Sequence, residues 1–446
     1  MRSGGATRGN QSVAVIGAGY VGLPTAAVLA HFGHRVVCAE RDANRFRTLV
    51  SGQIPIVEDG LEELVRESVE NGRLTFVADA VSAVQGADYV FLCVPTPETP
   101  DGSADLHYVT SVAAEIGSSL APSATVINKS TVPVGTAALV KQISDRHDIS
   151  VVSNPEFLRE GTAVHDSLRP DRIVVGADDR RAAARVAELF APSGAPVIVT
   201  DTVTAETIKY ASNAFLATKL SFVNTVASLC ESLGADVRDL ILGLCYDHRI
   251  GPDFLRPGPG WGGSCLPKDT VALITIARDV GYDFTLLRAA IEANQKQRRR
   301  IVDKVMTLTS DVRDARDSLV GVNVCAWGLS FKAGTDDRRM SPAIAIIRAL
   351  VEMGASVQAY DPTAPPLGEQ SLLEEVPEVV LRTTPYEAAR DAHVIVLLTE
   401  WDEFRALDFL KVASIMVSPR MVDARNVLDP VALRHLGFMY TAIGCP

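Results

Sequence analysis

Short apolar runs recur along the first two hundred residues, and segments of helical pattern separate them. The runs SVAVIGAG, HRVVCAE, YVFLCVP, ATVINKS and ISVVSNP alternate with helical stretches such as TAAVLAHFG. Continuous runs rich in valine and isoleucine that alternate with helices are typical of a parallel, doubly wound sheet covered on both faces. We therefore expect a first α/β domain over residues 1–200.

A long helical pattern follows this domain. The stretch TAETIKYASNAFLATKLSFVNTVASLCESLG is apolar at steps of three and four residues and ends at Gly234, and further helical patterns lie around 269–308. The alternation then resumes with SLVGVNVCAWG, SVQAYDP, HVIVLLT and MVDARN. The pattern predicts an α/β protein with two doubly wound domains joined by a long central helix, with a central helical segment at 201–310 and a second α/β domain at 311–446.

Length and composition describe a multidomain globular protein. The chain has 446 residues, 47% hydrophobic and 22% charged, which is too long for one ordinary core and too apolar for a disordered chain. The net charge of −11 disfavours nucleic acids and anionic membranes as partners, so an anionic ligand would need locally placed arginines and lysines. Because no run is long enough to span a bilayer and the start MRSGGATRGNQ is polar, we expect a cytoplasmic protein.

The seven cysteines are irregularly spaced, with no CxxC pair and no metal-type spacing with histidine. This favours free thiols and no metal site. Cys93 and Cys325 lie in apolar runs and read as small buried hydrophobic residues.

A glycine motif follows the first predicted strand. Gly17, Gly19 and Gly22 form GAGYVG at the head of a helix, and Glu40 lies near the end of the next strand. This context predicts a dinucleotide site, with glycines for the tight turn and a carboxylate for the ribose hydroxyls. Glu40 favours NAD, although Arg41 beside it leaves open a contact with the 2'-phosphate of NADP.

The loop GPDFLRPGPGWGGSCLPKD concentrates glycine and proline, and such a loop in a compact protein is usually functional. Pro267 suits a first helical turn, so the thiol of Cys265 is expected at the positive end of a helix with Lys268 nearby, which favours the thiolate. Asp269 is placed to act as a base or to position water. The competing interpretation is a structural cysteine beside a capping turn.

Two further polar pairs stand out. Lys209 and Asn213 are four residues apart and share one face of the long helix, where a cation and an amide would stabilise an oxyanion. Glu156 and Glu160 lie in NPEFLREG, near the carboxyl end of a predicted strand, where ligands of open α/β sheets bind. Ordinary solvated side chains are the alternative for both pairs.

Taken together, the motifs GAGYVGLP, CVPTP, STVPVGT, NPEFLREG, GGSCLPKD, FKAGTDDRR, AYDP and TEWDEF resemble the UDP-glucose and GDP-mannose dehydrogenase family along nearly the whole chain. The resemblance implies a Rossmann-like NAD domain, a central segment that forms a homodimer, and a Rossmann-like carboxy-terminal domain that helps to bind a sugar nucleotide. It implies no metal.

The resemblance also implies residue roles. Cys265 matches the nucleophile, Asp269 a water-associated aspartate, Lys209 and Asn213 the oxyanion and hydroxyl partners, and Thr131 and Glu156 residues that act through water. The implied cofactor contacts are Gly17, Gly19, Tyr20, Val21, Gly22, Glu40, Arg45, Thr96, Thr131, Glu160, Lys268 and Arg338. The implied substrate contacts are Glu156, Phe157, Leu158, Arg159, Glu160, Lys209, Asn213, Arg249, Phe254, Arg256, Gly262, Cys265, Phe331, Lys332 and Arg425, with Arg249 reaching across the dimer.

The implied reaction is a four-electron oxidation of the 6-hydroxymethyl group of a nucleotide-linked hexose to a uronic acid, with two NAD⁺ and a thiohemiacetal and thioester on the cysteine. The GGSC form favours UDP-glucose, then dTDP-glucose, while GDP-mannose and N-acetylhexosamine nucleotides stay open. Three positions depart from the family pattern, namely Glu40, Trp261 and Asn426, and the last bears on recognition of the base. The competing functions are a two-electron dehydrogenase without a covalent step and a catalytically silent nucleotide-sugar-binding protein.

Overall fold

The computed structural model describes residues 10–313, 315–364 and 376–445, so most of the polar start lies outside the described residues. The chain forms two compact units. The first comprises Met1–Ser212 and Val271–Val280, and the second comprises Asn213–Thr270 and Gly281–Pro446. Two helices, α9 (Thr202–Leu233) and α11 (Leu266–Asp279), contribute residues to both units.

The first unit is built on an eight-stranded sheet with the order β3-β2-β1-β4-β5-β6-β7-β8. The reversal between β1 and β4 is the topological switch point at which doubly wound sheets bind dinucleotides. The strands are β1 (Ser12–Ile16), β2 (Arg35–Ala39), β3 (Leu74–Val77), β4 (Tyr89–Leu92), β5 (Thr125–Asn128), β6 (Ser150–Ser153), β7 (Ile173–Gly176) and β8 (Val197–Thr200).

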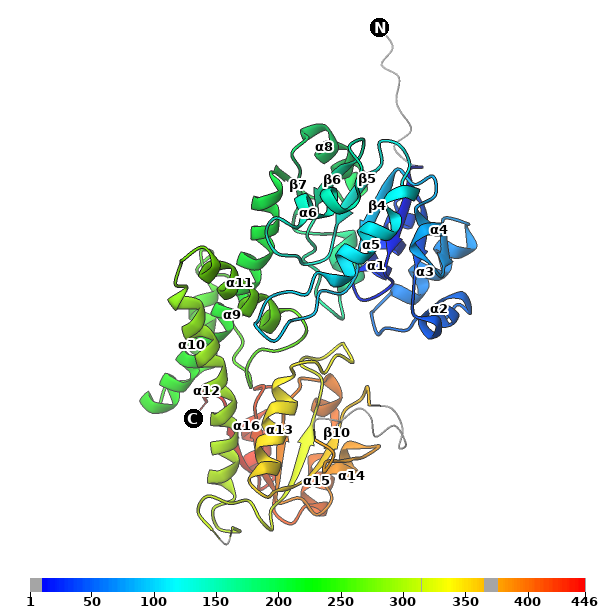
Figure 1. Cartoon of the computed structure of the whole chain (residues 1–446). Helices are drawn as coiled ribbons and strands as arrows, with labels where there is room; N and C mark the ends of the chain where they lie inside the picture. Colours follow the sequence, from blue (N-terminus) through cyan, green and yellow to red (C-terminus); the bar gives the residue numbers. More distant parts are fainter. Residues whose placement is uncertain (1–9, 314, 365–375, 446) are drawn as a thin grey trace. The chain divides into compact units, whose positions relative to one another are not determined.

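Helices cover both faces of this sheet (Figure 1). The helices are α1 (Gly22–His31), α2 (Ala43–Val50), α3 (Leu61–Glu70), α4 (Ala80–Val84), α5 (His107–Ile116), α6 (Thr136–Ile143), α7 (Ala163–Leu168) and α8 (Arg180–Leu189). α1 packs with α3 and α7, whereas α5 packs with α4 and α6, and each group encloses its own apolar core against the sheet. The predicted doubly wound architecture is therefore confirmed.

One feature of the sheet differs from the all-parallel expectation. β6 and β7 are antiparallel and share a single registered pair, Ser153 with Gly176, whereas β7 and β8 are parallel. The short helix α7 does not carry the chain back across the sheet as a full crossover would. The apolar runs of β6 and β7 look alike in sequence, so direction could not be read from them.

The second unit contains the carboxyl-terminal part of α9 together with α10 (Val237–Cys245), the start of α11 and α12 (Thr285–Leu308). α9 begins and ends close to the predicted limits, with Gly234 at φ +71° directly after its last residue. Apolar residues of α9 and α12 share a core with one face of the second sheet.

This second sheet has six parallel strands in the order β11-β10-β9-β12-β13-β14. The strands are β9 (Asn323–Trp327), β10 (Ser356–Tyr360), β11 (Val380–Leu381), β12 (Val394–Leu397), β13 (Arg420–Asp423) and β14 (Met439–Ala442). The helices around it are α13 (Pro342–Glu352), α14 (Pro385–Ala389), α15 (Phe409–Ile415) and α16 (Pro430–His435). Within the described ranges, no helix is both long and apolar enough to span a bilayer.

Candidate active site

The turn between β1 and α1 depends on its glycines. Gly17 has φ +99°, and a Cβ on Gly22 would lie 1.8 Å from the carbonyl oxygen of Gly17. Any side chain at Gly22 would therefore force the turn open. α1 begins at Gly22, so the positive end of its dipole faces the turn in which a pyrophosphate would bind.

Glu40 follows β2 and faces this turn. Its carboxylate accepts hydrogen bonds from the amides of Ala18 (3.2 Å) and Asp42 (2.8 Å). Glu40, Gly17, Gly19 and Arg45 line a cavity of about 790 Å³, a size that suits a large cofactor fragment. The residues present thus fit the adenosine part of a dinucleotide, with Glu40 placed for the ribose hydroxyls.

Two of the expected cofactor residues, Thr96 and Thr131, follow the carboxyl ends of β4 and β5. Thr96 Oγ1 donates to the carbonyl oxygen of Thr131 at 2.8 Å, which joins the two loops. Tyr20 and Val21 lie in the turn before α1, where Thr25 Oγ1 donates to the Val21 carbonyl at 2.7 Å. These expected contacts lie at the sheet edge next to the switch point.

A buried ion pair joins the segment after β6 to α9 within the first unit. Lys209 Nζ lies 2.8 Å from Glu156 Oε1, and the two side chains are only 4% and 5% exposed. Burial alone would raise the pKa of Glu156, but Lys209 and the Leu158 amide, which donates to Oε2 at 2.6 Å, hold that pKa below its usual value. The alternative of solvated side chains is therefore excluded for both residues.

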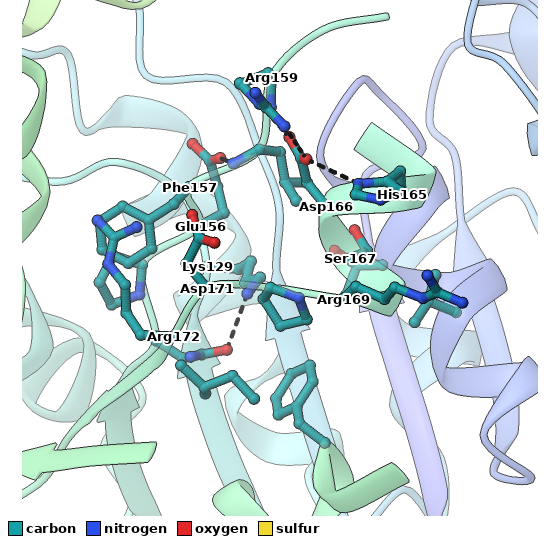
Figure 2. A pocket seen from close by; sticks show the side chains of 18 residues that line it. Lys129, Glu156, Phe157, Arg159, His165, Asp166, Ser167, Arg169, Asp171 and Arg172 are labelled. Carbon is teal, nitrogen blue, oxygen red and sulfur yellow. Dashed lines mark hydrogen bonds and ion pairs between the residues drawn. The ribbon is translucent and has the colours of Figure 1, made fainter. Parts of the chain in front are cut away.

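The segment that carries Glu156 borders a cavity of about 110 Å³, shown in Figure 2. At one edge of it the guanidinium of Arg172 stacks on the ring of Phe157, 3.6 Å from its centroid. Lys209 Nζ lies 5.6 Å from the same ring. Two cations thus lie within about 6 Å of the Phe157 ring centre, an arrangement that favours an aromatic ring.

The rest of NPEFLREG is fixed from outside the motif. Glu58 accepts from the amides of Gly161 (2.6 Å) and Ala163 (3.0 Å), which also caps α7. Arg159 pairs with Asp166 at 2.6 Å. The peptide segment expected to meet the sugar is therefore preorganised.

In the second unit, side chains of α9 and α12 hold the glycine-rich loop before α11. Asn294 accepts from the Trp261 amide (2.8 Å) and donates to the Trp261 carbonyl (2.9 Å). Trp261 Nε1 donates to Ser221 Oγ at 2.8 Å. A Cβ on Gly262 would lie 2.2 Å from the Met340 carbonyl, and one on Gly263 would meet the ring of Phe331 at 2.9 Å. The glycines are needed because other segments approach the loop closely.

Cys265 directly precedes α11, as its sequence context predicts. The Asp269 amide donates to the Cys265 carbonyl at 2.9 Å, which makes Cys265 the first carbonyl of the helix. Its thiol is partly exposed and lies 3.5 Å from Ser264 Oγ. The positive end of the helix favours the thiolate.

Asp269 is almost fully buried one turn into this helix. Its Oδ2 accepts from Asn213 Nδ2 at 2.5 Å, and its Oδ1 lies 2.9 Å from Lys268 Nζ. Asn213 is therefore oriented by Asp269, one helical turn after Lys209 on α9. This contact does not follow from sequence spacing.

Several expected substrate residues meet in the second unit. Arg425 donates to the carbonyls of Leu398 (2.8 Å) and Phe331 (2.7 Å), and its guanidinium lies 3.4 Å from a Cβ placed on Gly258. Lys332 lies beside Phe331, with Nζ 5.8 Å from the ring centroid. These contacts connect the glycine-rich loop to the carboxyl edge of the second sheet.

The other expected contacts of this unit are more dispersed. Arg256 is exposed, Arg249 pairs with Asp247 at 2.6 Å, and Phe254 adopts φ +58°. Arg338 lies 3.5 Å from Thr363 Oγ1. Asn426, one of the three departures from the family pattern, binds both main-chain groups of Ile443 and so anchors the chain after β14.

Several site-supporting residues carry no signal in the sequence. Glu206 accepts from Gly135 and Ala137 at the start of α6, and Lys129 donates to Asn154. Their partners lie far away along the chain. No group of three or more metal-ligating side chains is found within the described ranges.

The first unit has the fold and the glycine turn of a nicotinamide-dinucleotide dehydrogenase. Along the whole chain, three regions match the UDP-glucose/GDP-mannose dehydrogenase family. Residues 11–193 match its NAD-binding domain, residues 203–296 its central domain, and residues 325–430 its UDP-binding domain. The chain belongs to this family, and the resemblance drawn from the motifs is confirmed. It is an NAD-dependent enzyme.

Similar proteins cover the whole length. The UDP-glucose 6-dehydrogenase TuaD of Bacillus subtilis is 44% identical over 98% of this chain and 94% of its own. The UDP-glucose 6-dehydrogenase of Rhizobium meliloti is also 44% identical, over 97% of this chain and 99% of its own. The solved UDP-glucose dehydrogenase of Pyrobaculum islandicum is 34% identical, with a TM-score of 0.89 and full coverage of both chains.

Proposed function

We propose that the protein oxidises the 6-hydroxymethyl group of UDP-glucose to the carboxylate, with two NAD⁺ reduced per sugar. The observation that carries the proposal is the placement of Cys265 at the start of α11, within a family whose similar members are UDP-glucose 6-dehydrogenases. A two-electron dehydrogenase needs no such thiol. The overall balance is one alcohol, one water and two NAD⁺ converted to one carboxylate, two NADH and three protons.

In the first oxidation, the substrate hydroxyl loses its proton as its carbon loses a hydride, and an aldehyde forms. Bound NAD⁺ supplies the hydride acceptor in both oxidations. The buried Lys209 ammonium stabilises the developing oxyanion, and the ionised Glu156 accepts the proton through water.

In the second oxidation, the Cys265 thiolate adds to the aldehyde carbon, and the thiohemiacetal loses a hydride to become a thioester. Asn213, held by Asp269, donates to the oxyanion of the tetrahedral centre. Water then attacks the thioester, the C–S bond breaks, and the thiolate leaves. Asp269 and Glu156 position the water and take up its protons.

The substrate assignment rests on the second unit. Its residues 325–430 match the UDP-binding domain of the family, and Arg256, Lys332 and Arg425 supply positive charge for a diphosphate. We place UDP-glucose first and dTDP-glucose second. Turnover of GDP-mannose or of an N-acetylhexosamine nucleotide in preference to UDP-glucose would replace the assigned substrate. Binding without turnover would replace the assigned activity.

We further propose three domains along the chain: an NAD domain at 1–200, a central helical segment at 201–310 and a sugar-nucleotide domain at 311–446. The central helical segment is proposed to form a homodimer. Phe215, Phe222, Leu229 and Leu233 on α9 are each more than half exposed. Their spacing of seven and four residues places them on one face of the helix. Such an apolar stripe marks an interaction surface, so Phe222→Asp should give monomers in light scattering, whereas the wild type gives dimers.

The proposed location is the cytoplasm, because a reducing compartment keeps a catalytic thiol reduced, and none of the seven cysteines, all of which lie in the described ranges, forms a disulfide. The function is tested by a panel of UDP-, dTDP- and GDP-hexoses followed through NADH formation. Turnover of UDP-glucose above the others supports the proposal. Preference for a GDP-sugar would replace the substrate, and binding without turnover would replace the activity.

A further inference from the structure

Lys129, directly after β5, is a buried ammonium that the proposed reaction does not use. Its residue exposure is 9%, its Nζ donates to Asn154 Oδ1 at 3.0 Å, and it lies 5.3 Å from the ring centroid of Phe190. Burial lowers its pKa to about 8. Removing a cation from water is costly, so its position behind the site needs an explanation.

The partner of Lys129 lies at the start of the segment that carries Glu156. Asn154 Nδ2 donates to the Val174 carbonyl at 2.7 Å, so its amide bridges β7 and Lys129. This bridge lies where β6 and β7 share only one registered pair. On the opposite side β6 pairs with β5 as far as Ser153, and the Asn154 amide donates to the Asn128 carbonyl at 2.9 Å. The side-chain bridge therefore adds a restraint on the β7 side, where the ladder is short, two residues before Glu156.

Lys129 and Glu156 also border the same cavity of about 110 Å³ (Figure 2). At roughly 30 Å³ per molecule this volume holds three or four waters. Asn154 takes one of the three ammonium N–H groups, which leaves the others for such waters.

The titratable groups that act on Lys129 from neighbouring elements are Cys93, Glu156 and Lys209, and burial raises the pKa of the Cys93 thiol to about 12. The other titratable groups that line the cavity are Arg159, His165, Asp166, Arg169, Asp171 and Arg172. Asp166 is paired with Arg159, whereas Lys209 and Lys129 both act on the Glu156 carboxylate and lower its pKa.

We propose that Lys129 is a positioning residue for the reaction: it holds Asn154, and thereby the backbone that carries Glu156, and it supplies positive charge behind the Glu156 carboxylate. The inference rests on the proposed function, because it assigns Lys129 to the step in which Glu156 manages protons. Lys129 acts through Asn154 and Glu156 and needs no contact with the substrate.

The test compares Lys129→Met and Asn154→Ala with Lys304→Met, a control that removes a half-buried lysine paired with Glu231 in the second unit. Lys129→Met should lower kcat by about tenfold or more while the two KM values change less. Because one cation near Glu156 is lost, its pKa should rise, and the acidic limb of the kcat profile should move up by about one pH unit. Asn154→Ala should lower kcat without moving this limb, and Lys304→Met should do neither.

Hydrogen exchange followed by mass spectrometry supplies a readout that does not need activity. Peptides that cover 154–158 should exchange faster in Lys129→Met and in Asn154→Ala than in the wild type and in Lys304→Met, because the restraint on the segment is gone. Normal kcat in Asn154→Ala, an unmoved acidic limb in Lys129→Met, or unchanged exchange in both would overturn the inference. If the wild type forms no uronate while the two variants still exchange faster than the wild type, the proposed function is refuted. The restraint on the segment that carries Glu156 is then still supported.

Discussion

Replacing Lys209 with methionine removes one partner of the buried ion pair and leaves the carboxylate of Glu156 without its nearest cation. Both side chains are about 95% buried, so solvent cannot replace the lost charge. Breaking a buried pair in this way costs about 3–5 kcal/mol. For a domain of this size, where 1 kcal/mol shifts Tm by about 2–4 °C, Tm should fall by at least about 6 °C.

The fall in Tm of Lys209→Met should be smaller at lower pH. In the wild type the pKa of Glu156 is lowered, so the pair contributes stability above the unfolded pKa, and this contribution is lost as pH falls through the folded pKa. In Lys209→Met, burial dominates and raises the pKa of Glu156, so protonation relieves the buried charge. The difference in Tm between variant and wild type should therefore narrow from pH 7 to pH 5.

Differential scanning calorimetry of the apo proteins measures this effect. Lys141→Met, at an exposed position of α6, is the control and should change Tm by less than about 2 °C. The double variant Lys209→Met/Glu156→Gln should recover part of the loss, because no charge remains buried. A Tm of Lys209→Met equal to that of the control, or a difference in Tm that widens toward pH 5, would contradict a stabilising Lys209–Glu156 pair.

Three further predictions concern ligands and chemistry. NAD⁺ should support turnover much better than NADP⁺, because the Glu40 carboxylate repels a 2'-phosphate, and equal kcat/KM for the two would contradict this. Arg256→Ala and Lys332→Ala should each raise KM for the sugar nucleotide more than KM for NAD⁺, and unchanged substrate KM in both would remove them from the site. Cys265→Ser should bind both ligands in calorimetric titrations yet form the acid roughly a hundredfold more slowly, because a serine hydroxyl is far less acidic than a thiol. Near-normal acid formation by this variant would exclude the thiol as the nucleophile.

Features with a local cause could be predicted from the sequence. The periodicity of α9 and the glycine after it gave its limits, and Pro267 placed Cys265 at the start of α11. The GAGYVG turn and Glu40 were read from one strand–turn–helix–strand unit. In each case the residues that decide the structure are close together along the chain.

Contacts between distant segments could not be predicted. Glu58 binds Gly161 across 103 residues, and Asn294 binds Trp261 across 33. A buried lysine such as Lys129 looks the same in sequence as a solvated one, because charge alone carries no sign of burial. Recognising such side chains requires the tertiary structure that surrounds them.

In the proposed reaction, one enzyme carries out both oxidations with the intermediate held on Cys265. The most direct test is the number of NADH molecules formed per sugar when limiting UDP-glucose is consumed completely, with the product identified and free aldehyde trapped. We expect two NADH and one UDP-glucuronate per UDP-glucose, with no aldehyde trapped. One NADH per sugar, with an aldehyde as the product, would contradict it.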